Sequence, residues 1–97
     1  MNALQILLVD DDQDDIEFFM DAIHVINTSY TVSTCSNGLE CLEILHRFTP
    51  DLIFLDINMP LMDGKECLIK IRNSPALNDV KVVMCSTSIN TTDAQLF

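Results

Sequence analysis

Residues 52–64 read LIFLDINMPLMDG, and this stretch decides the fold. Its first part, Leu52 to Leu55, is a short apolar run bounded by polar residues, which indicates a β-strand buried on both faces. Asp56 ends the strand, and a loop with Pro and Gly runs from Ile57 to Gly64. Strands buried on both faces occur mostly in parallel sheets that helices cover on each side. We therefore expect an α/β fold around this strand.

The same pattern recurs on both sides of this stretch. Ile6 to Val9 and Val80 to Cys85 are further apolar runs, and Tyr30, Val32 and Thr34 alternate as a short strand does. Between the strands, apolar residues recur at the three- and four-residue spacing of amphipathic helices: Ile16, Phe19, Ile23 and Ile26; Leu39, Leu42 and Leu45; Cys67, Leu68 and Ile71. This alternation of strand and helix is typical of a parallel sheet with right-handed crossovers.

The length and the last residues define the domain. At 97 residues the chain is long enough for one hydrophobic core and too short for two, so we expect one domain over residues 1–97. Past the fourth strand, Asn90 or Thr91 followed by Asp93 predicts the cap of a further helix, which the sequence cuts off at Phe97.

The composition argues against several classes of function. A formal net charge of −10, from 15 acidic and 5 basic side chains, disfavours contact with nucleic acid and with anionic lipid. Each apolar run is far shorter than the roughly 20 residues that span a bilayer. Met1 to Gln5 carries no basic residue of a signal peptide. The four cysteines form no Cys-x-x-Cys pair, which indicates a reducing, cytoplasmic location and no zinc site.

Polar residues follow three of the strands. Asp10 and Asp11 come after the first strand, Asp56 after the third, and Ser86 with Thr87 after the fourth. Because the carboxyl ends of parallel strands meet at one edge of a sheet, we expect these side chains to converge there. Three carboxylates in one crevice repel, and a divalent cation relieves that repulsion. Oxygen ligands of this kind favour Mg²⁺, which also binds substrate phosphates.

Phosphate chemistry assigns a role to each of these side chains. A metal-bound carboxylate can accept a phosphoryl group, since aspartyl phosphate is a known covalent intermediate. Asp56 suits this role best, because it stands alone at its strand end. Asp10 and Asp11 are adjacent and can share the metal. Ser86, with Thr87 as the alternative, would donate a hydrogen bond to a phosphoryl oxygen.

Three stretches resemble the receiver domain of response regulators: Leu8-Val9-Asp10-Asp11; Leu55-Asp56-Ile57-Asn58-Met59-Pro60 with Met62-Asp63-Gly64; and Val83-Met84-Cys85-Ser86. The resemblance covers nearly the whole chain. It implies a flavodoxin-like, doubly wound parallel sheet with strand order 2-1-3-4. It also implies a phosphoacceptor rather than an enzyme, which receives its phosphoryl group from a histidine kinase or phosphotransfer protein and signals to a downstream protein target.

The resemblance also implies the residues of the site. Asp56 is similar to the phosphorylation site, and Asp10 and Asp11 are similar to the acid pair. The backbone carbonyl of Asn58 would complete the Mg²⁺ site, and Ser86 is similar to the conserved hydroxyl position.

The sequence departs from the family at its end. Receivers have a fifth strand that carries a lysine and a fifth helix, and this sequence stops before both. Lys65, Lys70 and Lys81 do not occupy the place of that lysine. The fourth strand would then be an exposed edge, so we expect a homodimer through that edge.

Two other functions are open at this point. One is an interaction module on the same fold that works without phosphorylation, because a fold alone does not define a function. The other is a phosphatase of the haloacid-dehalogenase type, whose strand-ending Asp-x-Asp could come from residues 10–12. That second class leaves the loop after Asp56 without a role.

Overall fold

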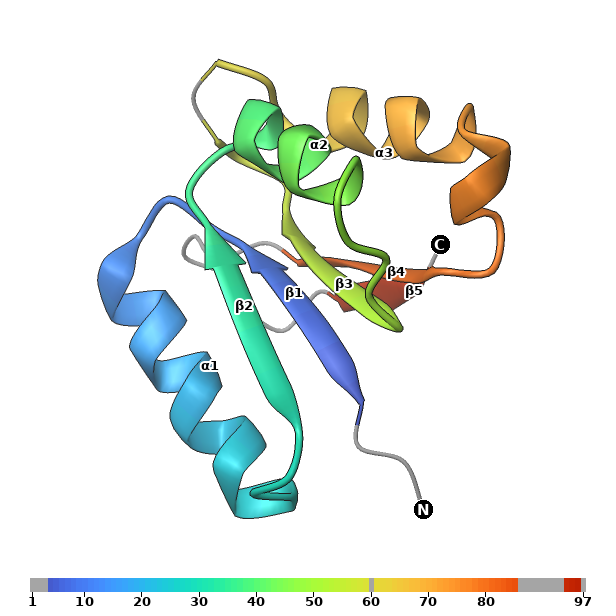
Figure 1. Ribbon diagram of the computed structural model, residues 1–97. Coiled ribbons are helices and arrows are strands. Elements are labelled where there is room, and N and C mark those ends of the chain that lie inside the picture. The colour runs from blue at the N-terminus through green and yellow to red at the C-terminus, as the bar shows by residue number, and fades with distance from the viewer. Residues whose placement is uncertain (1–3, 60, 86–93, 97) are drawn as a thin grey trace.

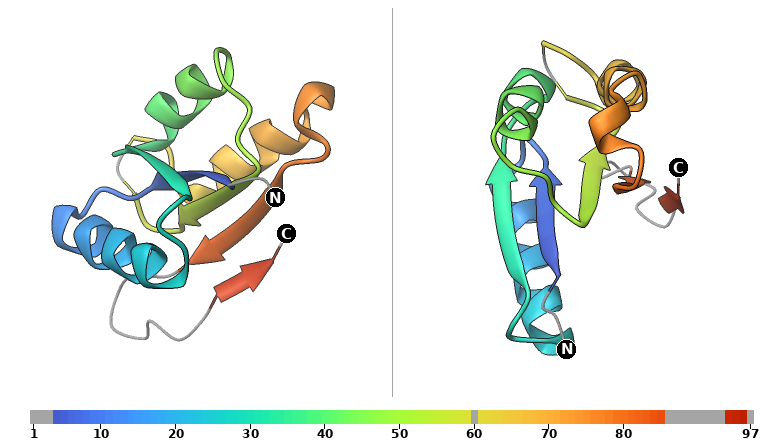
Figure 2. Two further views of the ribbon diagram at one scale, coloured as in Figure 1. Left: turned by 60° about the horizontal axis from the view of Figure 1, so that its bottom comes forward. Right: turned by 45° about the vertical axis from the view of Figure 1, so that its right-hand side comes forward.

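The computed structural model describes residues 4–59 and 61–85 and the backbone of residues 94–96. Within these ranges a five-stranded sheet has helices on both faces (Figures 1 and 2). The strands are β1 (Gln5–Val9), β2 (Thr31–Cys35), β3 (Leu52–Asp56), β4 (Lys81–Cys85) and β5 (Ala94–Leu96). The helices are α1 (Gln13–Ile26), α2 (Gly38–Leu45), α3 (Gly64–Arg72) and the short 3₁₀ helix η1 (Pro75–Leu77).

The first four strands are parallel and lie in the order β2-β1-β3-β4. The predicted parallel sheet with strand order 2-1-3-4 is therefore confirmed. In the register of the sheet, Val9 pairs with Cys35 on one side and with Leu55 on the other, and Asp56 pairs with Cys85. The carboxyl ends of β1, β3 and β4 consequently lie at one edge.

The two faces of the sheet are covered differently. On one face Leu7 and Val9 of β1 belong to the main core, together with buried side chains of α2 and α3. Side chains alternate along a strand, so Leu8 points to the other face, where α1 packs (Figure 2). There α1 buries Ile16 and Ile23. Among the described residues, α1 is thus the helix on one face of the sheet, and α2 and α3 lie on the other face.

Each of the three α-helices begins at a polar cap. The Asp12 carboxylate accepts hydrogen bonds from the backbone N–H groups of Asp14 and Asp15 at 2.9 and 3.4 Å. Asn37 and Asp63 cap α2 and α3 in the same way. Such caps satisfy backbone donors that a helix leaves unpaired at its first turn.

The end of the chain differs from the prediction. The predicted cap residues Asn90, Thr91 and Asp93 lie outside the described residues, but residues 94–96 form strand β5 and not the start of a helix. β5 runs antiparallel to β4 and pairs residues 94–96 with residues 83–85. The edge of β4 offers unpaired backbone groups, whereas a short helical segment gains little until several turns have formed. The helix prediction was wrong for these three residues for that reason.

In the described part of the chain, every helix is too short or too polar to cross a lipid bilayer.

Candidate functional site at the carboxyl edge of the sheet

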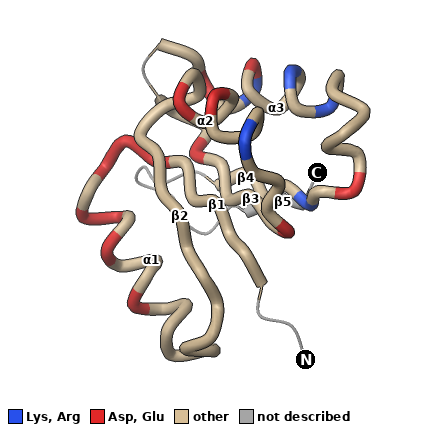
Figure 3. The backbone as a smooth tube through the Cα atoms, in the orientation of Figure 1, with Lys and Arg blue, Asp and Glu red and all other residues tan. Residues whose placement is uncertain are grey.

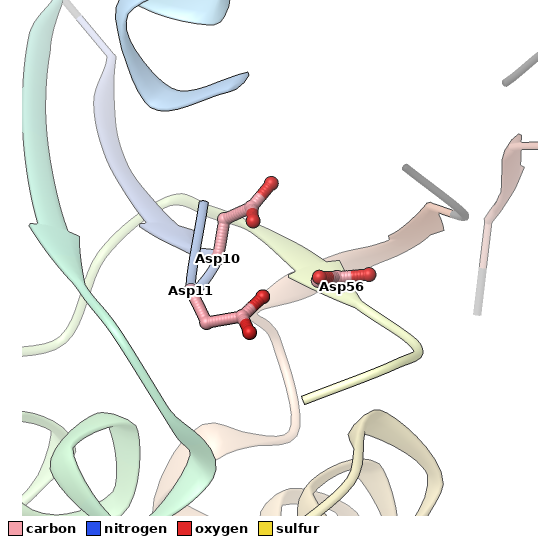
Figure 4. Close-up of side chains that lie close together, drawn as sticks. All are labelled: Asp10, Asp11 and Asp56. Atoms are coloured by element: carbon pink, nitrogen blue, oxygen red, sulfur yellow. The ribbon is translucent and has the colours of Figure 1, made fainter. Parts of the chain in front are cut away.

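Three carboxylates converge where β1 and β3 end. Asp10, Asp11 and Asp56 each offer an oxygen atom, and these atoms all lie within 4.8 Å of one another (Figure 4). Asp10 and Asp56 are only 3% and 2% exposed and are the buried charged residues of the described chain, while Asp11 is exposed. The predicted convergence of these three side chains is therefore present in the structure.

Backbone N–H groups orient the two buried carboxylates. The N–H of Asp12 donates to Oδ1 of Asp10 at 2.9 Å, and the N–H of Asn58 donates to Oδ1 of Asp56 at 3.1 Å. In both cases the donor lies two residues after the carboxylate, a turn that Asp side chains readily form. The local sequence thus holds each carboxylate at its strand end.

The electrostatics of the cluster favour a bound cation. Burial raises the pKa of Asp10 from 3.8 to about 6; the hydrogen bond from Asp12 opposes this change, and the nearby Asp56, Asp15 and Asp11 carboxylates add to it. A positive ion among these oxygens would offset the repulsion between the three carboxylates. The donors are all carboxylate oxygens, which hard divalent ions such as Mg²⁺, Mn²⁺ and Ca²⁺ prefer. The residues present therefore fit a divalent metal.

The loop after Asp56 folds back on its own strand. The N–H of Gly64 donates to the carbonyl oxygen of Ile57 at 3.0 Å, which closes the loop. A Cβ atom at Gly64 would lie 2.3 Å from the backbone oxygen of Asp56, so only glycine fits this position. Met59 and Met62 are buried and anchor the loop on the core.

The structure describes only one of the other predicted site residues. Asn58 lies beside Asp56 and bonds to it through its N–H, and the metal-binding role of its carbonyl stays a prediction. Ser86 and Thr87 lie outside the described residues, so their roles also stay predictions. β4 ends at Cys85, whose backbone carbonyl accepts a hydrogen bond from the N–H of Ile57 at 2.9 Å.

A cavity that the sequence patterns did not predict lies beside the cluster. A cavity of about 310 Å³ opens next to Asp10 and Asp56. Phe18 and Phe19 of α1 and Phe54 of β3 contribute to its lining, and the rings of Phe19 and Phe54 meet edge to face with centroids 4.6 Å apart. The periodicity of α1 placed Phe19 on the buried stripe. No local signal could show which strand that ring meets.

Comparison with known proteins shows the family. A family model described as the response regulator receiver domain matches residues 6–96. The chain therefore belongs to the response regulator receiver domains, the signalling modules of two-component systems. Its predicted flavodoxin-like fold is confirmed with this assignment.

Relatives with known names share this domain. The chain is 34% identical over 96 residues to a probable cyclic di-GMP phosphodiesterase of Vibrio cholerae, covering 99% of this chain and 21% of that protein. It is 30% identical over 95 residues to the response regulator Rcp1 of Synechocystis, covering 91% of this chain and 65% of Rcp1. The chain thus spans about a fifth of one relative and less than two thirds of the other.

Solved structures of response regulators support the same family assignment. The phosphorylated cyanobacterial phytochrome response regulator RcpA matches with a TM-score of 0.83 and 35% identity, over 92% of this chain and 69% of that one. The Mn²⁺-bound form of Rcp1 matches with a TM-score of 0.80 and 30% identity, over 90% of this chain and 68% of that one. Receiver domains bind a divalent metal through acidic residues, and the cluster of Asp10, Asp11 and Asp56 is suited to that role.

Proposed function

We propose that residues 1–97 act as a receiver domain that accepts a phosphoryl group on Asp56 from a histidine kinase or phosphotransfer protein. The domain then signals to a downstream protein through direct contact. The observation that carries the proposal is the buried Asp56 carboxylate, with oxygens of Asp10 and Asp11 within 4.8 Å, at the end of a central strand. The protein acts in the cytoplasm as a phosphoacceptor, without contact to nucleic acid or membrane.

The proposed transfer is a single displacement at phosphorus. A carboxylate oxygen of Asp56 forms a bond to phosphorus, and the bond from phosphorus to the donor's histidine nitrogen breaks. The imidazole keeps that electron pair and takes up a proton from water. Ser86, with Thr87 as the alternative, donates a hydrogen bond to a phosphoryl oxygen of the product.

The metal of this site is proposed to be Mg²⁺. Asp10, Asp11 and Asp56 hold it through their carboxylates, and the Asn58 backbone carbonyl completes the set. When bound, Mg²⁺ offsets the negative charge on the transferring group and on the carboxylates around it.

The phosphatase alternative needs Asp12 as a second carboxylate, but this side chain has another role. Oδ1 of Asp12 accepts two hydrogen bonds from the first turn of α1, so this side chain serves as a helix cap. Asp12 is also absent from the group of side chains that could share a metal with Asp10 in the described chain. An Asp-x-Asp pair formed by Asp10 and Asp12 therefore has no support here.

The test is phosphorylation by a small-molecule donor. We expect intact-mass analysis after incubation with Mg²⁺ and acetyl phosphate to show one added phosphoryl group. Asp56→Asn should abolish the gain, while Asp21→Asn, a change at an exposed carboxylate of α1, should retain it. A phosphoryl group on the Asp56→Asn variant would contradict the assignment of the acceptor. No gain in a folded wild-type chain would favour the module that signals without phosphorylation.

A further inference from the structure

Three of the four cysteines meet in the core, outside the carboxylate site. Cys35 ends β2, Cys41 lies in α2 and Cys67 lies in α3, and all three belong to the main core. All three are free cysteines, and the Cys41 thiol forms a hydrogen bond with each of the other two thiols. They come from three separate elements, so the fold and not a local motif brings them together. We call these three residues the thiol cluster.

The three thiols differ in their access to solvent. Cys35 is 7% exposed, whereas Cys41 and Cys67 are fully buried. The Cys67 thiol also donates a hydrogen bond to the backbone oxygen of Gly38, with sulfur and oxygen 3.9 Å apart. The susceptibility of a thiol to oxidation follows its exposure. Cys35 is therefore the thiol that a small oxidant reaches first, and Cys41 is a thiol beside it.

The surroundings of Cys41 favour a neutral product. Hydrogen bonds with the Cys35 and Cys67 thiols, together with burial, raise the pKa of the Cys41 thiol well above its ordinary range. A metal ion would need thiolates as ligands, and charge is costly in an apolar core. A disulfide carries no charge and suits this environment. The thiol cluster therefore favours a sulfur–sulfur bond over a bound metal.

The thiol cluster also adjoins the backbone that positions Asp10. Val9 of β1 pairs with Cys35 in the sheet. The N–H of Asp10 donates to the carbonyl oxygen of Cys35 at 3.0 Å. A new bond at Cys35 would therefore form one hydrogen bond away from the strand end that carries a carboxylate of the site.

We propose that the thiol cluster is a peroxide-sensitive modification site in which Cys35 and Cys41 form a disulfide. The inference goes beyond the proposed function and does not depend on phosphoryl transfer. In a reducing cytoplasm, disulfides of this kind are transient and act in catalysis or redox sensing.

The oxidant is hydrogen peroxide, and the reaction has two steps. The Cys35 sulfur forms a bond to one peroxide oxygen while the O–O bond breaks, and the released hydroxide takes the Cys35 proton to give water. The Cys41 sulfur then bonds to the Cys35 sulfur, the S–O bond of the sulfenic acid breaks, and hydroxide leaves with the Cys41 proton as a second water. Two thiols are oxidised, and one peroxide is reduced to two waters.

The test maps the thiols of the folded wild-type chain after exposure to hydrogen peroxide. Remaining thiols are alkylated with iodoacetamide in urea, and the chain is digested with trypsin without reduction. Residues 1–47 contain a single cleavage site, at Arg47, so one peptide holds both Cys35 and Cys41, while Cys67 falls in the peptide 66–70. The digest therefore distinguishes the two pairings that are open to Cys41.

We expect the 1–47 peptide to carry no alkyl group and to be lighter by two hydrogen atoms than its reduced form. Dithiothreitol before alkylation should restore both free thiols. A peptide 1–47 joined to 66–70 would overturn the pairing with Cys35. Alkylation of both cysteines after peroxide treatment, or the addition of oxygen atoms alone, would overturn the disulfide itself.

Matched variants test whether the effect belongs to the thiol cluster. Cys41→Ala and Cys35→Ser should each abolish the internal bond of the 1–47 peptide, with circular dichroism to confirm the fold. Cys85→Ala, at a half-buried cysteine outside the thiol cluster, should form the bond at the wild-type rate. Cys67→Ala should also retain it. Loss of the bond in Cys67→Ala or Cys85→Ala, with the fold intact, would contradict the assignment to Cys35 and Cys41.

Discussion

Two glycines set the shape of the loop that follows Asp56. A Cβ atom at Gly64 would meet the backbone of Asp56 and Ile57 at 2.3 and 2.9 Å. At Gly38 the nearest atoms, at 2.9 to 3.0 Å, are the backbone oxygen, Cβ and Cγ of Met62 in the loop. Backbone inside a buried strand end moves less readily than a loop residue does. The two positions therefore differ in how much they tolerate a side chain.

Gly64→Ala should lower the free energy of unfolding by about 1–3 kcal/mol, because the added methyl group forces the strand end and the loop apart. Phosphorylation by acetyl phosphate should fall as well, since Asp56 is the residue displaced. Urea unfolding and intact mass measure the two effects. Gly38→Ala is the control and should cost clearly less; an equal cost at both positions would contradict this account.

At the scale of elements, hydrophobic periodicity predicted which helices form but not how far each is covered. Ile16 and Ile23 are buried as the stripe of α1 predicts. Ile26 belongs to the same stripe and is 70% exposed, and Leu39 begins the stripe of α2 and is 51% exposed. Ile26 is the last residue of α1, and Leu39 lies in the first turn of α2. Periodicity along the sequence predicts which face of a helix is buried. It does not predict how much of that face a neighbouring element covers.

One arginine joins α3 to the start of β4. Arg72 donates hydrogen bonds to the carbonyl oxygens of Leu77 and Val80 at 3.2 and 2.8 Å. These bonds fix η1 and the turn into the strand that ends at the site. The sequence offered no signal for them, because the acceptors are backbone atoms that a lone arginine does not specify.

Arg72→Met should lower the free energy of unfolding by about 1–3 kcal/mol, since bonds from a charged donor contribute about 1.5–3 kcal/mol each and this side chain is half-buried. Chemical denaturation measures the change. Arg47→Met, at an exposed arginine after α2, should stay within about 0.5 kcal/mol of wild type. A loss at Arg47 as large as that at Arg72 would mean that net charge, not these bonds, sets the effect.

Across the whole molecule, charge is unevenly placed. Residues 1–46 contain no Lys or Arg, and all five such residues lie from Arg47 onward. Acidic residues lie along α1 and α2, and basic residues lie along α3 and after α2 (Figure 3). The side that bears Asp10, Asp11 and Asp56 is therefore the more negative side, which attracts cations to the cluster.

Mg²⁺ should raise the stability of the whole domain. At a free concentration 100 times its dissociation constant, a ligand that binds only the folded state adds about 2.7 kcal/mol. Asp10→Asn keeps the acceptor for the Asp12 N–H but removes a buried charge, so it should stabilise the metal-free chain and abolish most of the Mg²⁺ effect. Thermal unfolding with Mg²⁺, and with NaCl at equal ionic strength, measures this. A variant that is less stable without metal would contradict it.

The homodimer through the β4 edge stays a prediction. β5 pairs with residues 83–85 and leaves Lys81 and Val82 outside that pairing, so a dimer would use this remaining part or displace β5. Sedimentation velocity over the micromolar range should show mass rising with concentration. A constant monomer mass throughout would show that the edge does not associate.

The sequence by itself determined the class of fold, the order of the four parallel strands with the family resemblance, and the meeting of Asp10, Asp11 and Asp56. These follow from local patterns, because short apolar runs and helical spacing define each element. Parallel strands then bring their carboxyl ends to one edge.

The tertiary structure alone decided the antiparallel pairing of β5, the cavity that Phe19 and Phe54 help to line, the left-handed conformation of Leu61 and the exposure of Leu39. Each depends on which surfaces of separate elements meet and on where a partner surface ends. A pattern along the chain encodes the face that an element buries. It does not encode the neighbour that covers that face, which only packing in three dimensions settles.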